Sequence, residues 1–178
     1  LSAQLNFTLK NYDEALNLFT RAYELTHTDE LKINIARIYL IKKDCKKAKE
    51  VLSECKTESI KKYRLLALAL SSEGDFQGAK NALLKVSGYN DATADDYYNL
   101  SIFCEKSGDN DNAFKFLFKA FELNPDDYDI NVKIGIFLMT QTLNSFLVCA
   151  STPLAPSITM IAESTAVSVR KVSSAKSW

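Results

Sequence analysis

The apolar residues of this chain recur with the spacing of amphipathic helices that come in pairs. From 92 to 125 the chain reads ATADDYYNLSIFCEKSGDNDNAFKFLFKAFELNP. One helical face carries Tyr97, Leu100, Ser101 and Cys104, and a second carries Ala113, Leu117, Ala120 and Leu123. Gly108 predicts the turn between them, because glycine enters the left-handed region without steric cost. Pro125 ends the second helix, since it has no N–H with which to continue it.

The same order of small and large residues recurs along the chain. A small residue in the first helix of each repeat is followed twelve residues later by a small residue in the second helix: Ala3 and Ala15, Ala36 and Ala48, Ala67 and Ala79, Ser101 and Ala113. Four residues further on stand Phe19, Leu52, Leu83 and Leu117. Antiparallel helices approach closely only where side chains are small, and a bulky residue then fills the space one turn away. The pattern predicts four helix pairs and the first helix of a fifth.

This pattern resembles the tetratricopeptide repeat, a helix–turn–helix repeat of about 34 residues. The resemblance covers residues 1 to 140 and is carried by Tyr12, Ala15, Phe19, Ala22, Ile35, Ala36, Tyr39, Ala48, Leu66, Ala67, Gly74, Phe76, Ala79, Leu83, Leu100, Ser101, Gly108, Ala113, Leu117, Ala120 and Pro125. The Trp that the family prefers early in the first helix is Tyr63 or Tyr97 here. The resemblance implies an all-α fold, a right-handed α-solenoid of about four and a half antiparallel helix pairs.

We expect two regions in the chain, a helical repeat domain over 1–141 and an atypical tail over 142–178. In the tail Ser, Thr, Ala and Val dominate, Glu163 is the one acidic residue, and Pro153 and Pro156 break any helix. This composition favours a disordered or loosely packed tail. A foreign or misread sequence joined to a truncated array is the alternative. Two prolines and several hydroxyl groups argue against a membrane span from 143 to 162.

Candidate chemistry is sparse. The 22 basic and 22 acidic residues balance, so no global field attracts nucleic acid or an anionic membrane. The single histidine, His27, has no second histidine nearby with which to form a metal site or a catalytic pair. Asp95 and Asp96 lie in the first turn of a helix, where the macrodipole favours acidic residues. We therefore expect a protein that is not an enzyme and that needs no cofactor or metal.

The four cysteines bear on the cellular compartment. They show no C-x-x-C spacing, and three of them occupy helix faces where a small apolar residue would serve. This favours core packing over a disulfide or metal site, and with it a reducing, cytoplasmic location. The chain starts at Leu1 and its first helix lacks a turn, which indicates an excised or processed piece.

The first helices of successive repeats line the concave side of such an array, which forms an extended binding surface. By the register of the family, the residues expected to contact a partner are Asn34, Arg37, Arg64, Leu68, Tyr98, Asn99 and Ile102. Aliphatic and polar side chains alternate in this lining, which suits an extended or helical peptide with apolar anchors and acidic or backbone groups. Several of these residues would equally serve to pack adjacent repeats together. We expect a non-catalytic protein–protein interaction module.

Two other functions remain open from the sequence. The array could be the repeat region of a larger enzyme, for example a glycosyltransferase, whose catalytic domain lies outside this chain. It could also be a self-association scaffold, in which the unpartnered first helix of the fifth repeat forms a homo-oligomer.

Overall fold

The computed structural model describes residues 2–151, with side chains through 143, and every regular element in this range is an α-helix. The helices are α1 (Ser2–Thr8), α2 (Tyr12–Thr26), α3 (Asp29–Ile41), α4 (Cys45–Ser53), α5 (Ile60–Ser72), α6 (Phe76–Val86), α7 (Ala94–Lys106), α8 (Asn110–Leu123) and α9 (Tyr128–Ser151). The chain divides after Ile134 into two parts, and α1 to α8 lie wholly in the first.

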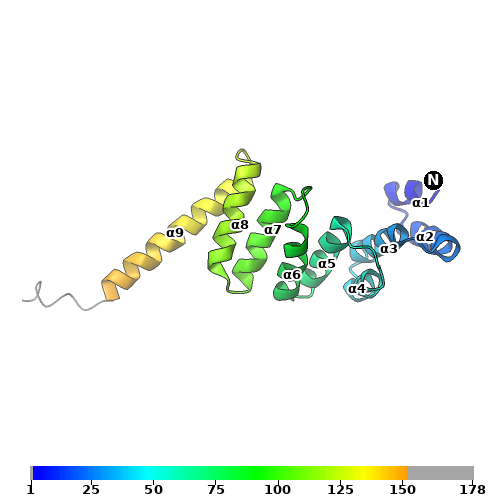
Figure 1. Cartoon of the computed structure of the whole chain (residues 1–178), viewed down its shortest axis with the longest axis horizontal. Helices are drawn as coiled ribbons and strands as arrows, with labels where there is room; N and C mark the ends of the chain where they lie inside the picture. The colour runs from blue at the N-terminus through cyan, green and yellow to red at the C-terminus, as the bar shows by residue number, and fades with distance from the viewer. Residues whose placement is uncertain (1, 152–178) are drawn as a thin grey trace, which may run out of the picture. The chain divides into compact units, whose positions relative to one another are not determined.

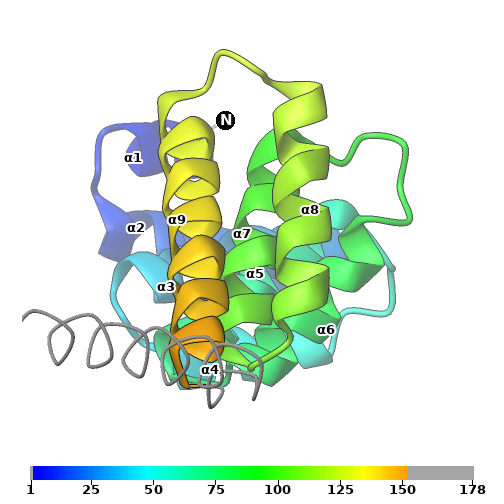
Figure 2. The same cartoon turned by 90° about the vertical axis from the view of Figure 1, so that its left-hand side faces the viewer.

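The first eight helices form four consecutive pairs. Each odd-numbered helix contacts the helix that follows it, and each second helix also contacts the first helix of the next pair. The helices follow one another in chain order (Figure 1), and in the end view α6 and α8 lie to one side of α5 and α7 (Figure 2). The predicted all-α solenoid of helix pairs is confirmed.

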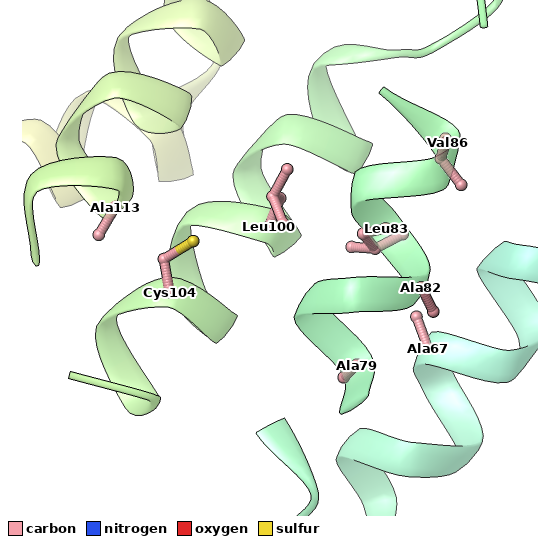
Figure 3. Packing of buried hydrophobic residues seen from close by; sticks show 8 residues of the cluster. All are labelled: Ala67, Ala79, Ala82, Leu83, Val86, Leu100, Cys104 and Ala113. Carbon is pink, nitrogen blue, oxygen red and sulfur yellow. The ribbon is translucent and has the colours of Figure 1, made fainter. Parts of the chain in front are cut away.

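The core consists of the small and large residues that define the repeat. The predicted small residues from Ala15 to Ala113 are 0–4% exposed, and the large residues that follow them are 0–5% exposed. Around α6 and α7, Leu83, Leu100 and Cys104 pack with four alanines and Val86 (Figure 3). Alanine at the helix contacts lets the backbones approach, and leucine fills the remaining space.

Polar side chains cap several helices at their predicted starts. Asp44 accepts a hydrogen bond from the backbone N–H of Lys47 at 3.2 Å, and Asp75 accepts one from that of Gly78 at 2.8 Å. Each bond satisfies an N–H group that has no partner within its own helix. These caps place the turns of the second and third helix pairs directly before α4 and α6.

The turn inside each helix pair contains one residue in the left-handed region. Gly74 and Gly108 occupy this position with φ values of 85° and 82°, while Lys10 and Lys43 occupy it with φ values of 63°. A side chain makes this conformation costly, whereas glycine adopts it freely. The first two turns therefore hold strained lysines where the last two have glycine.

Replacing Lys43 with Gly is expected to raise the free energy of unfolding by about 1 kcal/mol, because it relieves the left-handed strain. Urea denaturation followed by circular dichroism measures the change. The reciprocal Gly74→Lys variant is the matched control and should lose a similar amount, since open space surrounds Gly74 and only its φ opposes a side chain. Destabilisation by Lys43→Gly would contradict this account.

The last helix crosses the expected domain boundary. α9 continues to Ser151, whereas the repeat domain was expected to end at residue 141. The rest of the predicted tail, from residue 152, lies outside the described residues, and the division into two domains stays a prediction. Across the part that the structure describes, no helix combines the length and hydropathy needed to cross a membrane.

Candidate functional site

A cleft of about 580 Å³ opens between the first helices of the third and fourth pairs, α5 and α7. Its apolar lining combines the buried residues Ala67 and Leu83 with partly buried Phe103 and with Leu68, which is 52% exposed. The polar lining consists of Arg64, Ser71, Thr93, Asp95, Asp96 and Asn99. The cleft can therefore cover an apolar side chain and offer hydrogen bonds around it.

Helical spacing brings these residues to facing sides of the cleft. On α5, Arg64, Leu68 and Ser71 follow at intervals of four and three residues, which places them on one face. On α7, Asp95 and Asn99 are four residues apart, and Asn99 and Phe103 are again four apart. The two faces meet because α5 and α7 begin successive helix pairs.

An ion pair joins the two helices at one end of the cleft. The Arg64 guanidinium donates from Nε to Asp96 Oδ1 at 2.7 Å and from Nη2 to Asp96 Oδ2 at 2.5 Å. Asp96 also accepts from the backbone N–H of Thr93 at 2.9 Å, which is one half of a capping box for α7, and from the Thr93 hydroxyl at 3.0 Å. Asp96 thus fixes both the start of α7 and the position of Arg64.

The ionisation of this pair follows from its surroundings. Burial disfavours the charged form of Asp96, but hydrogen bonds from Arg64 and Thr93 outweigh burial and hold the pKa of this carboxyl below its usual value. The hydrogen bond to Asp96 likewise raises the pKa of Arg64. Both groups are charged at neutral pH, and each neutralises the other.

Three of the seven predicted contact residues meet in this cleft. Arg64 and Leu68 lie on α5 and Asn99 lies on α7. The other four do not line it: Asn34, Arg37, Tyr98 and Ile102. Of these, Arg37 lies with its guanidinium carbon 6.0 Å from the centroid of the Phe7 ring. The role of all seven in binding a partner stays a prediction.

Sequence reasoning missed the central role of Asp96. It explained this residue by the helix macrodipole alone, whereas Asp96 also anchors Arg64 across the cleft. The local signal was Thr93, three residues before an acidic side chain, which is the spacing of a capping box. The partner across the cleft had no local signal, because Arg64 stands on another helix.

The described residues offer little for catalysis or metal binding. Within them, no group of three His, Cys, Asp or Glu side chains could hold a metal ion. Cys55 and Cys104 are free and buried, and burial raises the pKa of both thiols. A raised pKa disfavours the reactive thiolate, so these two cysteines serve as core residues.

Comparison with known proteins agrees with this architecture. Residues 97–127, which span most of α7 and α8, match the family model described as tetratricopeptide repeat. A solved structure titled "Crystal structure of MamA" is 21% identical with a TM-score of 0.73, over 80% of this chain and 86% of that chain. A second, titled "Crystal structure of MamA protein", is 21% identical with a TM-score of 0.72, over 82% of each chain. The search of curated proteins found no significant match.

The resemblance to the tetratricopeptide repeat family is thereby confirmed. The family match identifies the fourth helix pair as such a repeat, and the solved structures share the fold of the array. Repeats of this class serve as protein-interaction modules, and the chain has the architecture of such a module.

Proposed function

We propose that this chain is a non-catalytic interaction module whose α5–α7 cleft holds a peptide or a helix of a protein partner. The observation that carries the proposal is an open cleft, with apolar residues among polar ones, between the first helices of two successive pairs. First helices of a solenoid form its extended binding surface. A cleft at this place can receive a side chain from a segment that lies along the surface.

Leu68 and Asn99 are the two side chains best placed to contact the segment. Leu68 is 52% exposed although it lies next to buried Ala67, so a ligand side chain would remove its apolar surface from water. Asn99 is exposed on the opposite helix, and its amide can donate to and accept from a peptide backbone. Arg64 has a different role, because its pairing with Asp96 makes it part of the wall of the cleft.

Peptides selected from a random display library on the full chain are expected to bind about tenfold more weakly to the Leu68→Asn variant, because an apolar contact is lost. Fluorescence anisotropy measures the dissociation constants. Leu84→Asn is the matched control, since Leu84 is 41% exposed, lies on α6 and is not part of the cleft. Equal loss of affinity in both variants, or in neither, would overturn the proposal.

A further inference from the structure

We propose that the segment bound in the α5–α7 cleft is basic, with a lysine or arginine next to an apolar anchor residue. This inference rests on the proposed function and names the chemical class of its partner. It is drawn from the charges at the edge of the cleft that the protein leaves without a partner.

The acidic residues around Arg64 outnumber it. Asp91, Asp95 and Asp96 all interact electrostatically with the guanidinium, and Asp96 alone forms an ion pair with it. Asp91 contributes only its backbone carbonyl, which accepts from Arg64 Nη2 at 3.3 Å. Among the described residues, no side chain forms a hydrogen bond or ion pair with the carboxylate of Asp91 or Asp95. Two exposed carboxylates therefore remain without an ion pair, that of Asp95 in the lining of the cleft and that of Asp91 beside Arg64.

The position that Asp95 occupies in its repeat holds other charged residues in the two preceding repeats. Asp95 stands six residues before the small residue Ser101, and the equivalent positions on α5 and α3 hold Lys61 and Glu30. Those two residues neutralise each other, since Lys61 Nζ lies 2.9 Å from Glu30 Oε1. Lys61 is therefore already paired with a residue of α3. Among the described residues, no lysine or arginine forms an ion pair with Asp95.

Lys106, the last residue of α7, also has an interaction partner within the chain. The Lys106 ammonium lies 4.9 Å from the centroid of the Phe76 ring, and Lys106 does not line the cleft. A ligand cation is therefore the group that would complement Asp91 and Asp95 through charge-assisted hydrogen bonds. An acidic segment would instead bring like charges together.

This conclusion differs from what the sequence favoured for the partner, a peptide with apolar anchors and acidic or backbone groups. That expectation came from Arg37, Arg64, Asn34 and Asn99, which lie among the aliphatic residues of the predicted lining. Two hydrogen bonds to Asp96 neutralise the charge of Arg64, and the guanidinium carbon of Arg37 lies 6.0 Å from the centroid of the Phe7 ring. Neither arginine therefore offers a free positive charge to a ligand. The groups that remain available to a ligand at the α5–α7 cleft are its apolar surface and the carboxylates of Asp91 and Asp95.

Peptide selection on the full chain tests the inference. Peptides whose binding is weakened by Leu68→Asn should be enriched in Lys and Arg. They should also bind about five- to tenfold more weakly to the double variant Asp91→Asn, Asp95→Asn. Asp111→Asn is the matched control, because Asp111 is an exposed acid in the first turn of α8 outside the cleft. Affinity should also fall as the salt concentration rises.

The outcomes separate the inference from the function on which it rests. Leu68-dependent peptides that are neutral or acidic, or that bind the double variant as tightly as the native chain, would overturn the basic partner and keep the cleft. Selection of no Leu68-dependent peptide would overturn the cleft itself. Circular dichroism of each variant confirms that the helices are retained.

Discussion

Replacement of Leu100 with Ala is expected to lower the free energy of unfolding by about 3–4 kcal/mol. Leu100 is 1% exposed and packs with residues of α5 and α6 and with Ala113 of α8. The substitution removes the transfer free energy of the side chain and leaves a cavity that rigid neighbouring helices fill only partly. Because Leu100 joins the third helix pair to the fourth, the change also weakens the interface through which adjacent pairs stabilise each other.

Urea denaturation at neutral pH, followed by circular dichroism, measures this loss. Leu25→Ala is the matched control, since Leu25 also lies on a helix but is 84% exposed, and its change should stay within about 0.5 kcal/mol. Similar losses in the two variants would mean that Leu100 is not the packing residue that connects α7 with its neighbours.

The sequence predicted the packing of the fold well because one physical requirement recurs at a fixed interval. Close approach of two helices requires small residues at the contact, so Ala48 and Ala79 identify the second helices without any structure. The turns were also evident at Gly74 and Gly108, where glycine alone enters the left-handed region freely. Lys43 shows the limit of this signal, because it adopts the same conformation without the residue that predicts it.

The end of α9 does not coincide with the predicted domain boundary. The boundary after residue 141 came from the change of composition at Thr142, after which acidic residues almost vanish and Ser, Thr, Ala and Val dominate. No glycine or proline follows until Pro153, so nothing in the local sequence stops the helix there. The helix accordingly continues to Ser151.

The sequence predicted some of the residues that line the cleft and did not predict its electrostatics. Repeat register named Arg64, Leu68 and Asn99, which line the cleft, together with four residues that do not. The state of Arg64 depends on a carboxylate 32 residues away on another helix, and a local pattern contains no information about that pairing. The sequence can indicate which side chains line a groove. Which of their charges remain unpaired depends on ion pairs between helices, and these are known only from the structure.

Substitution of Asp96 with Asn is expected to lower the free energy of unfolding by about 2–3 kcal/mol at neutral pH. The side chain of Asp96 is 9% exposed and accepts hydrogen bonds from both Arg64 and Thr93. Asn keeps the shape but loses the charge, and its NH₂ group would face donors where the carboxylate offered acceptors. The side chain of Arg64 is 39% exposed, so water compensates part of the loss, which keeps the effect below that of a fully buried pair.

The same substitution should change how stability depends on pH. The pKa of Asp96 is lower in the folded chain than its ordinary value of 3.8, so the unfolded chain binds the proton more readily. The stability that ionised Asp96 contributes is therefore fully present above about pH 5 and is lost as the pH falls through the folded pKa. Urea denaturation across this range should show the native chain and Asp96→Asn converging at low pH. A constant difference between native chain and Asp96→Asn at all pH values would show that shape rather than charge makes Asp96 stabilising.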